Sequence, residues 1–553
     1  MDANLIQILE DTATMLELAG ENPFKARAYS SAAHILEEQQ IDVFKSVKEN
    51  TLRNVAGIGA GLREGITEYV HTGKFAEYER LLKEIPSGVL DMTRLRGLGA
   101  KKVRSLHIQL GVSSISELEQ ACRKDKLCDI KGFGKKSQET ILKAIEMWRS
   151  SQGNFHQHKA LMDAEAIVSF LKEQKGFKAA EIAGDLRRRA ETVSELYIIA
   201  EGKSKEAGEV LKDQFELTEK NGILEGGHSP VFGIPFVVEI TDRKNYVQRL
   251  HETTGSEEFL IAFRKQFGED FLKKPFKNEE ELYEFLKIPY IEPELRESAD
   301  IIKLALQNKL PELIEPKHMR GMLHCHSTWS DGHNSIREMA LGAKALGYEY
   351  FAICDHSRTA SYAGGLTIER VKAQHEEVDK LNDEDLGIRI LKGIESDILP
   401  DGDLDYPDAI LKTFDIVVAS VHSSFTQTRE SQTARIIKAL ENPYTTILGH
   451  ATGRILLSRA GFDVDIEAII DTAAEFGKII EINANPYRFD LSWQNAKYAK
   501  ERGVRIAINP DAHAVAELEL TNLGIGIARK AGLEKSDIVN TLSCDEFLKL
   551  VKK

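Results

Sequence analysis

The chain has 553 residues, of which 42% are hydrophobic and 29% are charged, and its formal net charge at pH 7 is −14. This length exceeds what one hydrophobic core can hold and predicts about three to five domains of an ordinary globular kind. The acidic balance excludes a protein coated with nucleic-acid-binding surface, although it leaves room for a local basic patch.

Three features of the sequence bear on its location. No apolar run approaches the roughly 20 residues that cross a bilayer, and the chain starts with an acidic, amphipathic segment that is unlike a signal peptide. The five cysteines form no C-x-x-C pair, which suits reduced thiols. We therefore expect a cytoplasmic protein with no membrane partner, and we expect a monomer.

The N-terminal region repeats one pattern three times. Residues 3–19 and 24–39 predict amphipathic helices. An apolar residue, any residue, a glycine, an apolar residue and a second glycine then precede a predicted helix at residues 55–62, 95–102 and 130–137. Glycine permits a tight turn and close approach of a phosphate, and the start of the helix offers free N–H groups. The pattern therefore predicts three phosphate-binding turns.

These turns resemble helix-hairpin-helix motifs, which grip DNA backbones without reading sequence. Residues 101–150 add a basic patch, with eleven Lys or Arg against six acidic residues. The expected DNA contacts are Gly57, Gly59, Gly97, Gly99, Lys101, Lys102, Gly132, Gly134, Lys135 and Lys136. The first turn lacks lysines and is the weakest of the three. The alternative is that all three are structural turns between packed helices.

A second resemblance is carried by residues 183–199, which read A-G-D-L-R-R-R-A-E-T-V-S-E-L-Y-I-I. This segment is similar to the nucleotidyltransferase palm of family X DNA polymerases. In that family a Gly-Ser-x-Arg-Arg turn holds the triphosphate, and an Asp-x-Asp on the next strand holds two magnesium ions. Residues 253–256 and 291–296 look like parts of the family's thumb. Together with the hairpins, the resemblance to bacterial family X polymerases covers nearly the whole chain.

Several positions depart from the polymerase pattern. Asp185 replaces the serine of the turn, Glu195 and Tyr197 stand where the two aspartates would be, and Glu239 stands in place of a third. Two-metal phosphoryl transfer requires carboxylates that hold ions about 3.5–4 Å apart, and a tyrosine cannot replace a bridging aspartate on magnesium. We therefore predict a palm that has lost its polymerase activity and its Mg²⁺ ions.

Other polymerase-like positions are only partly kept. Arg187 and Arg188 could still bind a phosphate, or the domain could remain as a spacer and DNA clamp. Family members with lyase activity carry lysines after the first hairpin, where this chain has Gly61 and Gly65. The resemblance therefore does not imply lyase activity for this chain.

The C-terminal region alternates apolar runs with helical segments. The runs predict seven strands, at residues 321–326, 350–356, 389–397, 414–422, 445–450, 478–483 and 504–511. Helical segments such as 336–346, 465–476 and 493–502 separate most of them. Alternation of this kind predicts a parallel sheet closed as a barrel, in which the chemistry lies at the C-terminal ends of the strands.

Ligand-type side chains gather at those strand ends. Two histidines one residue apart end the first strand and point to the same side of it. The expected metal ligands are His324, His326, Asp331, His356, Glu395, His422, His450, Asp511 and His513. Nitrogen and oxygen donors suit Zn²⁺, Mn²⁺ or Fe²⁺. Nine donors exceed what one ion can use and predict two or three ions, with Glu395 as a bridge.

This ligand set resembles the PHP (polymerase and histidinol phosphatase) domain, a distorted seven-stranded barrel with a trinuclear metal site. All nine ligand positions of that domain have counterparts here, and the resemblance implies a 3′→5′ exonuclease whose ions activate water. Arg454 is an expected phosphate contact, with a salt bridge as the alternative. Cys325 and Cys354 alternate to the other side of their strands and are expected in the core.

The resemblances together predict a multidomain α+β and α/β protein. The expected domains are a helical lyase-like domain with a hairpin (1–85), a fingers-like hairpin domain (86–152), a nucleotidyltransferase-like palm (153–245), a thumb (246–312) and a (β/α)7 PHP barrel (318–553). The leading hypothesis is a DNA-repair exonuclease that binds gapped or 3′-ended DNA through its backbone. The alternatives are a working polymerase with proofreading, a small-molecule phosphatase of the histidinol-phosphate type, and a scaffold that only binds.

Overall fold

The computed structural model describes residues 3–38, 41–95, 97–202, 215, 217–220 and 223–552. The chain divides into two compact units. The first holds residues 1–154 with the short segments 229–233 and 457–459, and the second holds the remainder. Within the described ranges, every helix falls short of a membrane span in length or in apolar character.

The first unit is helical, as predicted, and contains two hydrophobic cores. Its helices are α1 (Ala3–Ala19), α2 (Pro23–Glu38), α3 (Val43–Lys48), α4 (Ala60–Thr72), α5 (Ala76–Glu84), α6 (Ser87–Thr93), α7 (Ala100–Leu110), α8 (Ile115–Arg123) and α9 (Lys135–Ser151). The predicted helix 24–39 corresponds to α2, and residue 39 lies outside the described residues. Helix α1 connects the two cores, because Leu5 lies in one and Leu16 in the other.

The three glycine pairs of this unit adopt the same turn. The first glycine of each pair has a positive φ, 86° at Gly57, 83° at Gly97 and 95° at Gly132, a region that favours glycine. The second glycine is extended and immediately precedes α4, α7 or α9. A side chain at Gly57 would meet Ile35, whereas both glycines of the second and third pairs face open space. The last two turns are therefore the more accessible ones.

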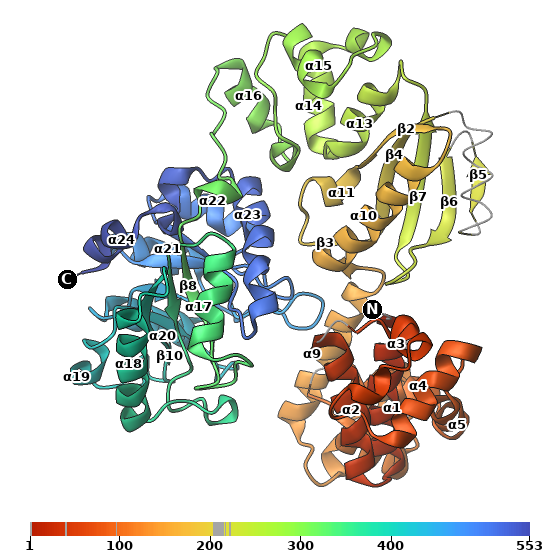
Figure 1. Ribbon diagram of the computed structural model, residues 1–553, viewed down its shortest axis with the longest axis vertical. Helices are drawn as coiled ribbons and strands as arrows, with labels where there is room; N and C mark the ends of the chain where they lie inside the picture. The colour runs from red at the N-terminus through yellow and green to blue at the C-terminus, as the bar shows by residue number, and fades with distance from the viewer. Residues whose placement is uncertain are drawn as a thin grey trace. The chain divides into compact units, whose positions relative to one another are not determined.

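The second unit begins with a five-stranded sheet in the order β2-β4-β7-β6-β5. Its strands are β2 (Phe177–Ile182), β4 (Leu196–Gly202), β5 (Thr218–Lys220), β6 (Ile223–His228) and β7 (Pro235–Thr241). Strands β4 and β7 run parallel, and the other neighbours are antiparallel. Helix α10 (Gln157–Glu173) lies along this sheet, and the short helix α11 (Gly184–Arg187) precedes β4 (Figure 1). The sheet lies within residues 153–245, which were predicted to form the palm, and we keep that name for the domain.

Four helices follow the sheet and enclose an aromatic core. They are α13 (Tyr246–Thr254), α14 (Glu257–Phe267), α15 (Glu279–Phe285) and α16 (Asp300–Leu306). The core contains Phe259, Phe263 and Tyr283, all fully buried. Arg296 is also fully buried and pairs with Glu279 at 2.5 Å, because a buried charge requires a partner.

A seven-stranded parallel sheet confirms the predicted barrel. Its strands are β8 (Gly321–Cys325), β9 (Tyr350–Ile353), β10 (Arg389–Asp397), β11 (Ile416–Ser420), β12 (Ile447–Leu448), β13 (Ile479–Asn483) and β14 (Ile506–Asn509), paired in chain order. The two edges approach each other, since the N–H of His326 donates to the carbonyl of Ala512 at 2.8 Å. The barrel is therefore nearly closed.

The helices of this domain lie outside its strands (Figure 1). They are α17 (Ile336–Ala345), α18 (Ile368–Asp383), α19 (Asp408–Leu411), α20 (Arg429–Glu441), α21 (Ile466–Glu475), α22 (Trp493–Glu501), α23 (Thr521–Lys530) and α24 (Cys544–Val551). Cys325 and Cys354 are fully buried, and burial raises the pKa of both thiols.

Several strands are shorter than predicted at their carboxyl ends. Strand β8 ends at Cys325, not at 326, and β9 ends at Ile353, not at 356. Beyond these points the backbone leaves the regular ladder, and His356 keeps only an isolated bridge to Glu395. The predicted ranges were too long because they ran through to the ligand-type residues, which lie just after the strands.

Candidate metal centre

The predicted ligands lie at the carboxyl ends of the barrel strands. Eight of the nine form three overlapping groups in which all ligand atoms lie within 4.8 Å of one another. The groups are His326 with Asp331, His356 and His513; His324 with His326 and Asp511; and His356 with Glu395 and His422. Two histidines belong to two groups each, so the three groups are neighbours in one centre. The ninth predicted ligand, His450, contacts Glu395.

Glu395 lies at the middle of this centre. Its carboxylate oxygens are 3.0 Å from Nδ1 of His356, 3.3 Å from Nε2 of His422 and 2.9 Å from Nε2 of His450. The same carboxylate is 3.7 Å from Nε2 of each histidine of the H-x-H pair. One buried carboxylate therefore reaches five imidazoles, as a bridging ligand would.

The donor set fits divalent metal ions. Nδ1 of His326 and Nδ1 of His450 are buried and have no hydrogen-bond partner among the described residues. The Nε2 atoms of His324 and His326 face each other at 3.3 Å. A buried polar atom without a partner costs roughly 1–3 kcal/mol. Lone pairs of imidazoles and carboxylates that converge in this way are the donors that Zn²⁺, Mn²⁺ and Fe²⁺ accept.

Carboxylates and imidazoles in the centre shift one another's pKa values. Burial opposes ionisation, yet the facing histidines hold the pKa values of Glu395 and Asp511 well below their usual range. Burial likewise opposes a charged imidazole, yet Glu395 and Asp331 raise the pKa of His356 to about 10. Neighbouring carboxylates raise the pKa of His422 to about 9 in the same way. An incoming metal ion must therefore displace protons.

Two stacked rings differ in their proton affinity. His326 and His513 lie with ring centroids 4.2 Å apart. Burial, aided by the charges of His513 and His356, lowers the pKa of His326 to about 3. The carboxylates Asp331 and Asp511 outweigh burial at His513 and raise its pKa to about 9. His326 is therefore neutral near pH 7, the form in which a histidine binds metal.

Glu481 of β13 is a buried carboxylate that the sequence analysis did not single out. Its Oε1 lies 2.8 Å from Nδ1 of His324. Its oxygens also accept hydrogen bonds from the side chains of Asn509 and Asn483 and from the N–H of His450. A carboxylate on the second ring nitrogen fixes the tautomer and orientation of a metal-binding histidine. The available signal was a glutamate between isoleucines in a buried strand, because such a charge needs partners.

Two further buried carboxylates hold segments of the centre in place. Asp397 lies 2.6 Å from Nδ1 of His422. Asp355 accepts hydrogen bonds from the N–H of Ser327 at 2.8 Å and from the amide of Gln374 at 2.6 Å. Asp355 thereby fixes the turn that follows β8. These carboxylates hold a candidate ligand and the turn beside the centre in position through hydrogen bonds.

In the palm, the carboxylate of Glu239 faces an arginine, whereas Glu395 of the barrel faces histidines. Both oxygens of Glu239 accept hydrogen bonds from Arg249, at 2.5 and 2.9 Å, and one also accepts from the hydroxyl of Tyr197 at 2.8 Å. Against the effect of burial, these contacts lower the pKa of Glu239. Glu195 is exposed. Within the described part of the chain, no group of potential metal ligands includes a palm residue.

The two arginines predicted to meet a triphosphate are engaged with protein atoms. Arg187 pairs with Glu279 at 2.7 Å. Arg188 pairs with Glu297 at 2.9 Å and with Asp185. Since each guanidinium faces a carboxylate, their charge is largely neutralised within the protein. A triphosphate would have to displace these carboxylates.

Arg454 forms an ion pair with Glu191 at 2.9 Å. Its guanidinium also donates to the backbone carbonyls of Arg488, at 2.9 Å, and Phe489. The salt bridge that was the alternative is thus present, and a phosphate contact stays a prediction.

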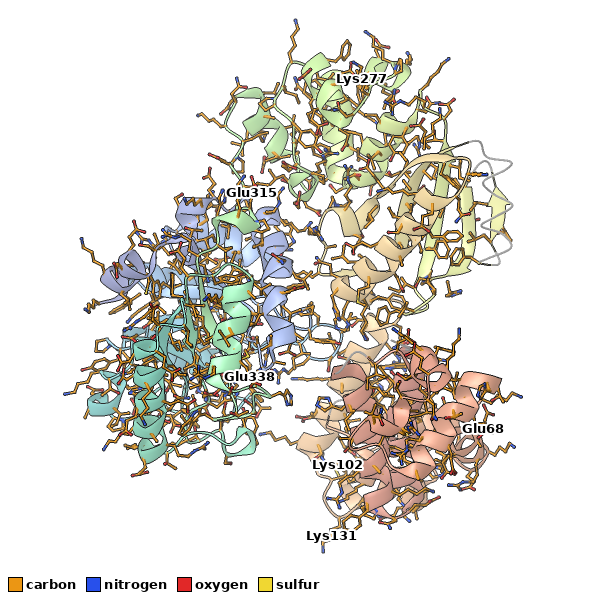
Figure 2. All side chains as sticks on the ribbon, in the orientation of Figure 1. Glu68, Lys102, Lys131, Lys277, Glu315 and Glu338 are labelled. Carbon is orange, nitrogen blue, oxygen red and sulfur yellow. The ribbon has the colours of Figure 1, made fainter. Side chains whose placement is uncertain are left out.

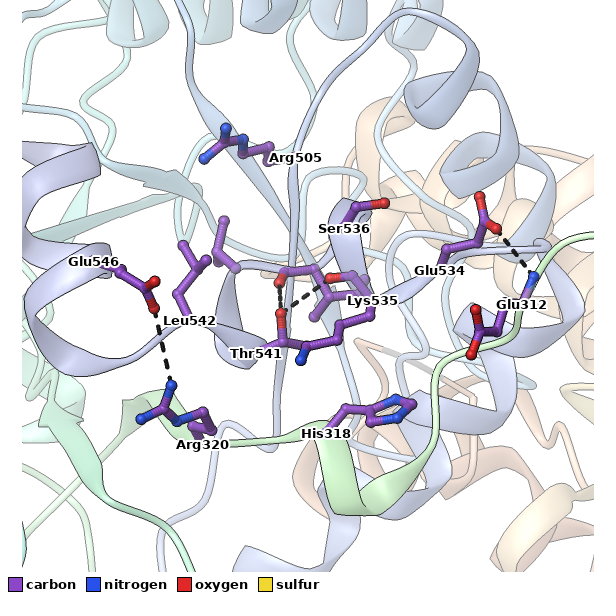
Figure 3. A pocket seen from close by; sticks show the side chains of 12 residues that line it. Glu312, His318, Arg320, Arg505, Glu534, Lys535, Ser536, Thr541, Leu542 and Glu546 are labelled. Carbon is purple, nitrogen blue, oxygen red and sulfur yellow. Dashed lines mark hydrogen bonds and ion pairs between the residues drawn. The ribbon is translucent and has the colours of Figure 1, made fainter.

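A separate cavity of about 650 Å³ lies at the other end of the barrel strands (Figure 3). Its lining includes Arg320, which precedes β8, and Arg505, which precedes β14. None of the nine predicted ligands lines it. The cavity and the candidate metal centre are therefore at opposite ends of the barrel.

The lysines that follow the second and third glycine turns are exposed. Figure 2 shows Lys102 and Lys131 at the surface of the first unit. The ammonium of Lys102 donates to the carbonyl of Gly97 at 2.9 Å, within its own turn. These cations lie beside turns that face open space, an arrangement suited to a phosphate backbone.

Comparisons with known proteins extend these observations. Family models match residues 2–75 (helix-hairpin-helix domain), 89–147 (SAM-like helix-hairpin-helix tandem) and 322–509 (PHP domain). The DNA polymerase/3′-5′ exonuclease PolX of Bacillus subtilis is 38% identical over an alignment of 573 positions, which covers 100% of this chain and 99% of that protein.

Shorter relatives are similar over a length close to that of the barrel. A probable phosphatase of Thermoanaerobacter sp. is 34% identical over 231 residues, or 39% of this chain and 89% of that protein. A probable phosphatase of Acetivibrio thermocellus is 31% identical over 241 residues, or 42% of this chain and 94% of that protein.

Proposed function

This chain belongs to the PolX family, and we propose that its PHP barrel is a metal-dependent 3′→5′ exonuclease that acts on DNA during repair. The observation that carries the proposal is the cluster of candidate ligand atoms in three overlapping groups around Glu395. Similarity along the whole chain to a protein named as a polymerase and 3′-5′ exonuclease supports DNA as the substrate.

We propose that the centre holds two or three divalent ions, of Mn²⁺, Zn²⁺ or Fe²⁺. The nine candidate ligands would hold them, with Glu395 between neighbouring ions. Bound ions of this kind lower the pKa of water to near 7 and stabilise charge on a phosphoryl group.

The chain's own residues prepare the centre for such ions. Glu481 and Asp397 hold the rings of His324 and His422 in one orientation, which preorganises the donors. Apolar side chains fill the interior and neighbouring layers of the barrel, so the charged groups meet a water-poor environment in which their electrostatic interactions are strong. The protonated histidines His356 and His513 release protons when ions bind.

We propose that the hairpins of the first unit bind DNA through its backbone. The exposed lysines after the second and third turns support this, and the pattern offers no means of reading bases. Affinity should then fall steeply with salt, because bound phosphates release their counterions. The preference for gapped or 3′-ended DNA, the monomeric state and the cytoplasmic location remain part of the proposal.

We propose that the palm does not polymerise. The ionic contacts of Glu239 with Arg249 leave little negative charge for a magnesium ion, and Tyr197 offers no carboxylate. A working polymerase would need these contacts to break and at least two new carboxylates to enter.

One observation favours a second candidate function. Relatives close in length to the barrel are named probable phosphatases, so a small-molecule phosphatase is the rival. The hairpins of the first unit argue against it, because such an enzyme has no need of a DNA clamp.

The test is a 5′-labelled primer on a gapped template, incubated with the full chain and Mn²⁺, with and without nucleotides. We expect shortening in both reactions and extension in neither. A parallel assay with a small phosphomonoester should show much lower kcat/KM than DNA. Template-dependent extension would overturn the palm proposal, and preferred turnover of the monoester would favour the phosphatase.

A further inference from the structure

The loop after β13 brings an arginine to the metal centre. Strand β13 ends without one of the nine predicted ligands, but Arg488 follows it in the chain. Its Nε lies 3.8 Å from Oδ2 of Asp511, and its side chain is 22% exposed. Among the described residues, the Arg488 guanidinium makes one ion pair, with Asp511, and no hydrogen bond. Its N–H groups are therefore available to a ligand.

Arg454 holds the backbone of the loop that carries Arg488. Its guanidinium donates to the carbonyls of Arg488 and Phe489, and its charge is paired with Glu191. These contacts fix the backbone of the loop, so the Arg488 side chain loses less entropy on binding a phosphate than it would on a free loop. Arg454 thereby positions the loop that carries Arg488, and its own phosphate contact stays a prediction.

An aromatic side chain lies at the same centre. Tyr362 belongs to a short 3-10 helix (Ser361–Ala363) that follows β9. It is 72% exposed, and its ring centroid is 6.3 Å from that of His356. Partial desolvation, then Asp397 and other carboxylates of the centre, raise the pKa of its hydroxyl, and Arg488 lowers it. Tyr362 therefore lies at the edge of the centre, with much of its ring facing solvent.

Building on the proposed exonuclease function, we propose that Arg488 and Tyr362 form a subsite for the terminal nucleotide of the substrate. Arg488 donates paired hydrogen bonds to non-bridging phosphate oxygens, the geometry that a guanidinium fits. Tyr362 offers its ring to the base, a stacking contact that any base can make. The ligand class is a nucleoside monophosphate unit, and the ring distinguishes it from a bare phosphate.

Binding to the full chain loaded with Mn²⁺ tests this subsite directly. Inorganic phosphate and thymidine monophosphate are titrated calorimetrically against the wild type, Arg488→Gln, Tyr362→Leu and the control Arg502→Gln. Arg502 is an exposed arginine of the barrel whose charge pairs with Asp471. We expect Arg488→Gln to weaken both ligands about tenfold or more, as expected for lost charged hydrogen bonds. Tyr362→Leu should weaken the nucleotide alone, and the control should match the wild type.

Kinetics on DNA and on a small phosphodiester give a second readout. Arg488→Gln should lower kcat/KM for both substrates, and Arg488→Lys should recover part of the loss because it restores the charge. Added guanidinium should rescue Arg488→Ala and leave Glu395→Ala inactive. Tyr362→Leu should raise KM for DNA without changing kcat/KM for a diester that lacks a base.

Each outcome decides a separate point. Unchanged phosphate affinity in both Arg488→Gln and Arg488→Lys would overturn the subsite. Loss of bound manganese in both variants would also overturn it, because Arg488 would then act by holding Asp511 in place. Unchanged nucleotide affinity in Tyr362→Leu would remove the ring from it. If the wild type binds both ligands in the expected way but leaves DNA intact, the subsite stands and the exonuclease proposal fails.

Discussion

The metal centre of the barrel and the palm both bring carboxylates together, but they neutralise them differently. In the barrel, Glu395 faces imidazoles, whose nitrogens can give up protons and bind a metal instead. In the palm, Glu239 faces the guanidinium of Arg249, which cannot deprotonate near neutral pH. A carboxylate held by histidines remains open to a cation, whereas one held by arginine does not.

The comparison shows how the charges of a polymerase-like segment can be paired within the protein. Arg188 of the palm turn now pairs with Glu297, and Glu297 also pairs with Lys530 of α23 in the barrel. Charges that resemble a triphosphate site are thereby used within the protein. In the palm, Glu239 and Arg188 are paired with charges of the protein, whereas in the described part of the barrel centre Nδ1 of His450 is buried without a hydrogen-bond partner. Buried polar atoms without a partner are expected at a site that binds a ligand.

The largest expected effect comes from removing the bridge. Glu395→Gln should lower kcat/KM for shortening of 3′ ends by about 1,000-fold, or about 4 kcal/mol, because an amide cannot bridge two ions. Metal content measured by mass spectrometry should fall in the same variant. Retention of more than a tenth of the activity with full metal content would contradict the role of Glu395.

Removing a carboxylate that contacts a ligand histidine should have a smaller effect. Glu481→Gln should lower metal affinity or activity about 10- to 100-fold, because His324 loses the partner of its Nδ1. The matched control is Glu501→Gln, at an exposed glutamate of α22. Equal behaviour of the two variants in a metal titration would exclude a role for Glu481.

The raised histidine pKa values predict that the stability of the metal-free barrel falls as pH rises, while its affinity for metal increases. Protonation of His356, His422 and His513 stabilises the folded apoprotein fully below about pH 6.5, the usual pKa. This contribution is lost as pH rises through about 9 to 10. Metal affinity should rise over the same window, because fewer protons must be displaced.

Thermal unfolding of the chelated and Mn²⁺-loaded protein between pH 6.5 and 10 measures this difference. For the chelated protein, Glu395→Gln provides the control, since it removes a carboxylate that raises two of these pKa values. If the gain in Tm on adding manganese does not grow with pH, the three histidines are not the groups that release protons.

The hairpin lysines should contribute to DNA affinity in small steps. The double variants Lys101→Ala/Lys102→Ala and Lys135→Ala/Lys136→Ala should each lower the salt slope of binding by about one per lost phosphate contact. Lys83→Ala, at an exposed lysine of α5, is the control. Anisotropy titrations over a salt series provide the slopes, and unchanged slopes in both double variants would leave the turns as structural elements.

The palm should show the smallest effect on the nuclease. Glu239→Gln breaks a charged contact with Arg249 but leaves the barrel centre intact, so the rate of 3′-end shortening should stay within about twofold of the wild type. Neither protein should extend a primer. A large drop in nuclease rate at unchanged thermal stability would mean that the palm site takes part in catalysis.

Local patterns were sufficient to predict the barrel and the hairpins. The alternation of apolar runs with helices predicted seven parallel strands, and the positive φ values of Gly57, Gly97 and Gly132 occur where the glycine spacing indicated turns. These features depend on a few neighbouring residues and on periodicity, so they can be predicted from the sequence. The strand ends were harder to predict, because the hydrogen-bonded ladder of the sheet stops where tertiary contacts redirect the backbone.

The partners of each charge depended on the tertiary structure. Glu481 lies 157 positions from His324, and the chain offers no local sign that the two meet. The same holds for Arg249 beside Glu239, for Ile35 over Gly57, and for the loop that carries Arg488 to the metal centre. Residue types and spacing determined by themselves which domains form and which side chains could bind metal or phosphate. Folding decided which of those side chains remain open to a ligand, because pairing between distant residues sets the charge and the hydrogen bonds that each one has left.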